Sequence, residues 1–257
     1  MKVRDFENYI DSKIPFSTAA SWDNVGLLVG CRDTEVTKIM LALDITQNVI
    51  EEAEKEGCNL IISHHPVIFH PIKRVVDSRE EQGVICELIK RSISAICLHT
   101  PLDFCENGTN DALAKACGLE DPKECCKDQN GLFFGRVGGV KEKTFTDLVT
   151  LVKSRLSAPT VLYHELQNEV KTVAVVAGSG GSKILEVKAL GADTLITGEA
   201  KHSDFVTAQN VGINLVVVGH YHSEKPGLEY LEKLILEFAP DTEIVYATAL
   251  DDLYKAL

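Results

Sequence analysis

Long apolar runs are absent from the sequence, and none approaches the ~20 consecutive apolar residues of a membrane-spanning helix. Eight cysteines are present, but no two of them form a CxxC pair, and the opening Met-Lys-Val-Arg is not followed by the apolar core of a signal peptide. We therefore expect reduced thiols, a cytoplasmic location and no membrane association.

Positive charge is also scarce. The 257 residues include 26 Lys and Arg against 38 Asp and Glu, which gives a net charge of -12. This balance argues against a broad surface for nucleic acid or for an anionic membrane, although a focused site or a bound metal could still attract an anionic substrate. With 45% apolar and 25% charged residues, the chain has ordinary globular composition and can bury a large core.

Apolar runs of strand length alternate with helical periods along most of the chain. In one such unit, Thr46 is expected to cap a helix, Gly57 to end it, and a strand to follow. The predicted strands are 38–43, 59–63, 93–98, 132–137, 161–164, 171–176, 194–197, 214–218 and 243–248. The predicted helices are 4–13, 49–56, 79–91, 109–117, 146–156, 182–190, 203–210 and 228–238. This alternation predicts an α/β fold built from βαβ units.

A turn-rich stretch, Lys127-Asp-Gln-Asn-Gly131, interrupts the alternation, which then restarts. We expect it to separate two α/β domains, residues 1–127 and residues 128–257.

Three segments share one frame of glycine, apolar strand and polar end. Counting from Gly57, Gly191 and Gly212 places His65, Glu199 and His220 at equivalent positions. Either the segments are related repeats, or the frame reflects how βαβ folds are commonly built. In both cases the polar residues are expected at the same edge of their sheets.

The doublet His64-His65 ends an apolar run, 59–63, that reads as a buried parallel strand. The run 212–219 similarly leads to His220 and Glu224, which share one helix face if a helix opens there. Open α/β sheets place ligand sites at the carboxyl ends of strands. Because imidazoles and carboxylates are the ligands that Zn, Mn and Fe sites share, these ends predict a metal centre.

Five side chains follow predicted strands and can bind a first-row metal: His64, His65, Asp103, His220 and Glu224. A hydrolytic zinc site commonly takes three protein ligands, so five favour two ions per chain, of Zn, Fe or Mn. Asp103 or Glu224 could bridge ions roughly 3.5 to 4 Å apart. Residues that could orient the ligands or move protons, and so take part in catalysis, are Asp44, His99, Glu199 and His202.

Other motifs leave their alternatives open. The glycine-rich stretch 177–182 lies between a strand and a helix and could bind phosphate or be an ordinary turn. Residues 22–24 could line a substrate pocket or form a structured loop in which the single tryptophan packs. Adjacent Cys125 and Cys126 are more typical of a loop than of a metal site.

Several motifs together resemble the NIF-three-like proteins, a dinuclear-metal family also known as GTP cyclohydrolase 1 type 2 homologs. The resemblance rests on Ser-Trp-Asp-Asn-Val-Gly-Leu-Leu-Val-Gly at 21–30, Ser-His-His-Pro at 63–66, His-Thr-Pro-Leu-Asp at 99–103, Thr-Gly-Glu at 197–199 and Gly-His-Tyr-His-Ser-Glu at 219–224. These motifs occur in order over nearly the whole chain.

The resemblance implies two similar three-layer α/β/α repeats with the metal site in the cleft between them, and a toroidal homohexamer. It implies metal ligands at the same five residues that the chemistry selected. Some longer family members carry an extra domain in the middle, whereas only a short connection separates the two halves here.

The leading functional hypothesis is a dinuclear metal-dependent hydrolase. If the family description transfers, the substrate is GTP, and its guanine imidazole ring is opened with release of formate. A two-metal phosphoester hydrolase is an enzymatic alternative. A non-catalytic metal-binding, metal-delivery or scaffold protein is the other, and a metal site closed by protein ligands would favour it.

Overall fold

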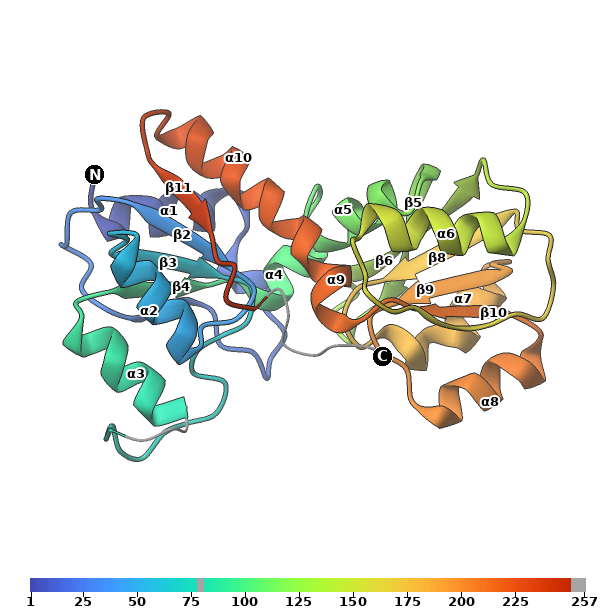
Figure 1. Ribbon diagram of the computed structural model, residues 1–257, viewed down its shortest axis with the longest axis horizontal. Helices are drawn as coiled ribbons and strands as arrows, with labels where there is room; N and C mark the ends of the chain where they lie inside the picture. The colour runs from blue at the N-terminus through green and yellow to red at the C-terminus, as the bar shows by residue number, and fades with distance from the viewer. Residues whose placement is uncertain (78–80, 251–257) are drawn as a thin grey trace. The chain divides into compact units, whose positions relative to one another are not determined.

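The computed structural model describes residues 1–77 and 81–250, and it divides into two compact units. Unit 1 comprises Met1–Leu102 together with the segment that begins at Leu228, and unit 2 comprises Asp103–Gly227. Each unit contains a β-sheet with helices on both faces (Figure 1). The prediction of an α/β fold with two layered units is therefore confirmed.

Unit 1 has a sheet with the strand order β1-β4-β3-β2-β11, in which β1 is antiparallel to β4 and the other neighbours are parallel. Its strands are β1 (Gly26–Val29), β2 (Ile39–Ala42), β3 (Leu60–Ser63), β4 (Ser94–Cys97) and β11 (Ile244–Tyr246). Its helices are α1 (Val3–Lys13), α2 (Gln47–Lys55), α3 (Glu81–Lys90), α10 (Leu228–Phe238) and the start of α4 (His99–Phe104), with a 3₁₀ turn at Phe16–Thr18.

The central strands of unit 1 are almost entirely apolar, apart from Ser63 and Ser94, because helices cover both of their faces. Every residue of β2, β3 and β4 is buried. In Figure 1, α1 and α10 lie on one face of the sheet and α2 and α3 on the other. Parallel strands that are covered on both faces read as continuous apolar runs, which is why these three were predictable.

Unit 2 has a sheet with the order β5-β6-β8-β9-β10-β7, in which β8, β9 and β10 are parallel. Its strands are β5 (Leu119–Lys127), β6 (Phe133–Val140), β7 (Leu162–His164), β8 (Thr172–Val176), β9 (Thr194–Thr197) and β10 (Asn214–Val217). Its helices are α5 (Thr109–Ala116), α6 (Phe145–Arg155), α7 (Ile184–Ala189), α8 (His202–Val211) and α9 (His220–Glu224), with 3₁₀ turns at Gly180–Lys183 and Lys225–Gly227.

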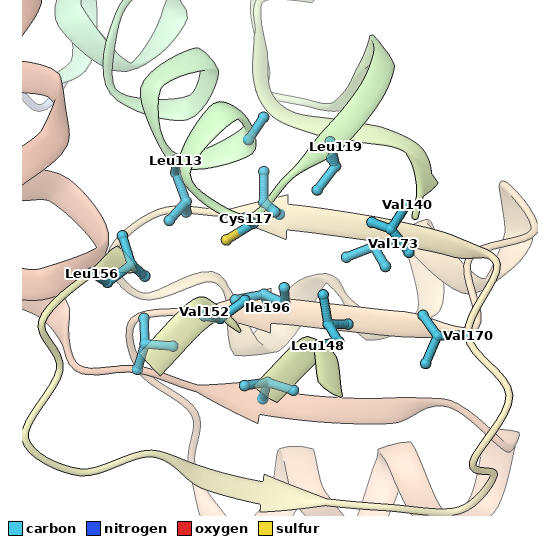
Figure 2. Close-up of a cluster of buried hydrophobic side chains, with 14 of the residues drawn as sticks. Leu113, Cys117, Leu119, Val140, Leu148, Val152, Leu156, Val170, Val173 and Ile196 are labelled. Carbon is cyan, nitrogen blue, oxygen red and sulfur yellow. The ribbon is translucent and has the colours of Figure 1, made fainter. Parts of the chain in front are cut away.

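The core of unit 2 has two parts, one on each face of the sheet. On one face, Leu113 of α5 and Leu148 of α6 pack with Val173 and Ile196 of the strands (Figure 2). On the other face, residues of α7 and α8 pack against the same strands. Burying each large aliphatic side chain contributes roughly 1.5 to 3 kcal/mol, so both faces stabilise the parallel strands.

The ends of several helices agree with the predicted signals. The Thr46 hydroxyl accepts a hydrogen bond from the Val49 amide at the start of α2. Gly57 follows that helix with φ of +76°, and Gly212 ends α8 with φ of +72°. Glycine takes these left-handed values without steric strain, so both residues suit the turn from a helix into a strand.

The predicted boundary between residues 127 and 128 does not coincide with the division into units. Antiparallel β5 and β6 pair across the turn-rich stretch, with Lys127 opposite Phe133. The stretch is thus a hairpin turn inside unit 2, and its Gly131 has φ of +83°. Turn residues are typical of hairpins as well as of linkers, so the pattern alone could not distinguish the two.

Among the described strands and α-helices, β1, β5 and α4 were not predicted. Strand β1 is an antiparallel edge strand whose two middle residues are only partly buried, and β5 carries five consecutive exposed residues and Pro122. The expectation that Cys125 and Cys126 lie in a loop is wrong, because both are buried in β5. The α4 helix spans a segment that was expected only to follow a strand. The first residues of the helix predicted over 79–91 lie outside the described residues. Within 1–77 and 81–250, no helix has the length and apolar character to cross a membrane.

Replacing Leu148 with alanine tests the core of unit 2. Leu148 is fully buried, so we expect the variant to lose about 2–5 kcal/mol of unfolding free energy through lost burial and a cavity. Leu185→Ala, the same change at a side chain that is 60% exposed, should stay within about 0.5 kcal/mol of the parent. Denaturant unfolding measures both, and equal losses would contradict this account of the core.

Candidate metal centre

The histidine doublet lies directly after β3 in unit 1, and its backbone extends the sheet. The amides of His64 and His65 donate to the carbonyls of Ala42 and Leu43 at 3.1 and 2.8 Å. The Ser63 hydroxyl donates to the His65 carbonyl at 2.8 Å. His64 is 1% exposed, and His65 is partly buried. The strand therefore holds both imidazoles at its carboxyl end, as predicted.

His99 joins the doublet from the end of the neighbouring strand. It follows β4, begins α4, and donates its amide to the His64 carbonyl at 2.7 Å. Its φ is +33°, a value that costs a non-glycine residue about 1–3 kcal/mol and persists only where the surroundings impose it. The imidazole centroid of His99 lies 5.4 Å from that of His64 and 5.5 Å from that of His65.

These three imidazoles could hold a metal ion. One ring nitrogen from each of His64, His65 and His99 lies within 4.8 Å of the others. The prediction placed His99 only in a supporting role, whereas the structure places it in the same group as the two predicted ligands. Three neutral imidazoles are a donor set that first-row metals accept.

Two carboxylates orient the imidazoles of unit 1. Asp44 Oδ1 lies 2.8 Å from Nδ1 of His65, and Asp23 Oδ1 lies 2.8 Å from Nδ1 of His99. An ionised carboxylate can only accept, so Nδ1 of a neutral ring carries the proton and Nε2 keeps a lone pair. A carboxylate behind an imidazole is the usual support of a histidine that binds a metal.

Asp23 is held in its charged form by its surroundings. Its side chain is fully buried, and burial raises the pKa, but hydrogen bonds from His99 and Thr100 outweigh this effect and leave the pKa of Asp23 below its ordinary value. Asp23 was not predicted as a site residue because its partners lie 76 and 77 residues away in the sequence. The only sequence signal was its place in the Trp-Asp-Asn motif.

In unit 2, His220 and Glu224 lie together on α9, which follows β10 (Figure 1). Nε2 of His220 lies 3.1 Å from Oε2 of Glu224, and Glu224 is 6% exposed. Ligand atoms bound at about 2.0 to 2.2 Å to one ion lie roughly 3 to 3.5 Å apart. The pair therefore lies on one face of α9, as the four-residue separation predicted, and its spacing is compatible with two ligands of one ion.

Glu199 contacts Nδ1 of His220, as Asp44 and Asp23 contact Nδ1 of His65 and His99. Its Oε2 lies 3.3 Å from Nδ1 of His220. The Ser179 hydroxyl donates to Glu199, which is the main cause of its lowered pKa, and the contact with His220 adds to it. The predicted supporting role of Glu199 thus agrees with its position.

The glycine-rich stretch between β8 and α7 packs against these residues. The amide of Gly178 donates to Ser223 Oγ, that of Gly180 to Thr197 Oγ1, and that of Gly181 to the Glu199 carbonyl. These three amides are used within the protein, so they do not form the phosphate cradle that was one interpretation of the motif. A Cβ atom at Gly178 would lie 2.3 Å from Glu224 Oε1, so glycine is required for the close approach.

The remaining predicted residues take different places. Asp103 lies on α4, four residues after His99, and its carbonyl accepts from Asn110 at 3.2 Å. Asn110 also accepts from the Ala177 amide, which ties α5 to the end of β8. His202 is exposed at the start of α8, and no hydrogen bond among the residues described joins it to Glu199 or His220.

Residues 1–251 match the family model of Duf34/NIF3, described as NGG1p interacting factor 3. The chain belongs to the Duf34/NIF3 family. Its relatives include a Clostridium perfringens protein, 34% identical over 99% of both chains, and a Staphylococcus aureus protein, 29% identical over 93% of this chain and 94% of the relative. Both are named GTP cyclohydrolase 1 type 2 homolog.

Solved structures share the fold over nearly the whole chain. A Staphylococcus aureus hypothetical protein superimposes with a TM-score of 0.91 at 31% identity, covering 100% of this chain and 99% of that one. Reduced HcgD from Methanocaldococcus jannaschii superimposes with a TM-score of 0.81 at 32% identity, covering 96% and 98%. The resemblance to NIF-three-like proteins is thereby confirmed.

Replacing Gly178 with alanine tests whether the glycine stretch positions Glu224. The new Cβ would displace the carboxylate, so we expect affinity for a divalent metal, measured by titration calorimetry, to fall roughly 10- to 100-fold. Gly191→Ala is the matched control, because its φ of +88° imposes a similar backbone cost of about 1–2 kcal/mol but no atom lies within 4 Å of the added Cβ. An equal loss of affinity in both variants would attribute the effect to backbone strain.

Proposed function

We propose that this protein is a metal-dependent hydrolase that binds two divalent ions per chain, of Zn, Fe or Mn. The proposed ligands are His64, His65, Asp103, His220 and Glu224, with His99 as a further donor or a proton carrier. The observation that supports this most is that a carboxylate contacts Nδ1 of each of three imidazoles. The pairs are Asp44 with His65, Asp23 with His99 and Glu199 with His220.

The side chains have separable tasks in this proposal. Bound divalent ions would lower the pKa of a water molecule and stabilise developing charge. Asp23 and Asp44 keep the Nδ1 proton of their histidines in place, so that Nε2 is the basic atom. Glu199 does the same for His220. The Ser223 hydroxyl accepts from the Gly178 amide and donates to the His220 carbonyl, which ties α9 to the glycine-rich turn after β8.

GTP is the substrate that we propose first, since the relatives of this chain are named GTP cyclohydrolase 1 type 2 homolog. The reaction would be hydrolytic opening of the guanine imidazole ring with release of formate. We also propose that the protein assembles as a homohexamer in the cytoplasm, on the resemblance of its motifs to NIF-three-like proteins. Light scattering on the purified protein measures the assembly directly.

Metal analysis tests the proposed centre. Purified protein, loaded with metal and dialysed, should carry close to two ions per chain by elemental analysis, because the donor set exceeds what one ion uses. His64→Ala should lose at least one of them. His164→Ala, which removes an imidazole that bonds to Gln209 elsewhere in unit 2, should keep both. Equal metal content in all three proteins would contradict the ligand assignment.

Formate release from GTP tests the proposed reaction. Metal-loaded wild type should release formate, and Glu224→Gln should release it roughly 10- to 100-fold more slowly, because a neutral amide is a weaker ligand than a carboxylate. Equal rates in the two proteins would assign the activity to a contaminant. Full metal loading without turnover on GTP or on phosphoesters would instead favour a metal-binding or metal-delivery protein.

A further inference from the structure

Two exposed aromatic side chains lie beside the histidine group of unit 1. Trp22 is 60% exposed and Phe69 is 40% exposed, and their ring centroids are 5.9 Å apart. Both lie against His99, with centroids at 5.6 Å for Trp22 and 6.1 Å for Phe69. We refer to Trp22 and Phe69 as the aromatic platform. The sequence left open whether the tryptophan packs inside a loop, and its exposure shows that it does not.

The residues next to both rings of the platform are tied down by hydrogen bonds, although the rings themselves face solvent. Asp23, the residue after Trp22, is buried and bonds to His99 and Thr100. The Asn24 side-chain amide donates to the carbonyl of Ile68 at 2.7 Å, which ties the loop of Trp22 to the residue before Phe69. Rings that are positioned before a ligand arrives lose little conformational entropy on binding.

The geometry of the rings determines what they can bind. Trp22 and Phe69 touch each other at an interplanar angle of 49°, so no ligand ring fits between them. The indole is 60% exposed, so it can offer a stacking surface to a ligand on its solvent side, beside the phenyl ring. Flat heteroaromatic rings such as nucleobases stack on surfaces of this kind, and the interaction needs no charge from the protein.

We propose that the aromatic platform binds the base of a purine nucleoside or nucleotide by stacking on Trp22. The His99 ring contacts both the platform and the doublet. A base stacked on Trp22 would therefore be separated from the predicted ligands His64 and His65 by the His99 ring. This inference rests on the proposed function in one respect, namely that the bound base is the part of the substrate presented to the metal. The stacking itself can be measured without turnover.

The single tryptophan of the chain makes the test direct, because all indole fluorescence comes from Trp22. The indole of metal-free protein is excited at the red edge of its absorption while guanosine is added. Guanosine should quench the Trp22 fluorescence in a saturable way. Ribose and inorganic triphosphate, which lack the base, should not. Absence of quenching by guanosine, or equal quenching by ribose, would overturn the proposal.

Variants assign the binding to the platform. In equilibrium dialysis with guanosine, Trp22→Ala should weaken binding roughly 5- to 150-fold, and Trp22→Phe should recover most of the loss because it restores a ring. Tyr163→Ala removes an aromatic side chain of unit 2 that is 57% exposed and should bind as wild type does. Unchanged affinity in Trp22→Ala, with an altered oligomeric state, would identify the platform as a contact between copies and overturn the proposal.

The two proposals fail in different ways. Saturable quenching without formate release from GTP by metal-loaded protein would retain the platform and reject the proposed reaction. Formate release that is unchanged in Trp22→Ala, together with no quenching in wild type, would retain the hydrolase and reject the platform.

Discussion

A contact between a carboxylate and Nδ1 of an imidazole recurs three times among the described residues, and the candidate metal chemistry depends on it. Asp44, Asp23 and Glu199 lie 2.8 to 3.3 Å from Nδ1 of His65, His99 and His220, respectively. Each contact fixes the ring orientation and leaves Nε2 as the basic nitrogen. Without it, an imidazole could rotate and exchange tautomers, and a metal would have to select one arrangement from several. The lowered pKa values of Asp23 and Glu199 keep two of these carboxylates charged.

Within each unit, parallel strands whose carboxyl ends lie at one edge of the sheet supply the histidines of these contacts. In unit 1, β3 delivers the histidine doublet and β4 delivers His99, while in unit 2, β9 and β10 deliver Glu199 and His220. The same arrangement has a cost in backbone freedom, because His99 lies at φ of +33° and Gly178 is packed too closely to Glu224 for any side chain. Sites of this kind commonly concentrate such constraints where function requires fixed geometry.

The sequence was a good guide to the strands and to the residues at their ends. Apolar runs such as 60–62 and 215–218 identify buried parallel strands, and the histidines that follow within two residues of each run are easily noticed. It was a poor guide to partners that are distant in the chain: Asp23 bonds to a histidine 76 residues away, and no local pattern reports that contact. The edge strand β5, with its exposed charges, has no apolar run, and the hairpin turn after it resembles a linker. Periodicity reports burial, whereas pairing between distant segments depends on the folded chain.

Anomalous diffraction from crystals grown with Zn²⁺ tests the central claim most directly, because it locates each ion relative to individual ring nitrogens. The account predicts that ions bind Nε2 of His65 and of His220, while Nδ1 of each ring keeps its contact with Asp44 or Glu199. Ions bound through Nδ1, with those carboxylates turned away, would contradict the claim that the carboxylates select the ligand nitrogen. So would crystals in which zinc binds none of the doublet, His99, His220 or Glu224.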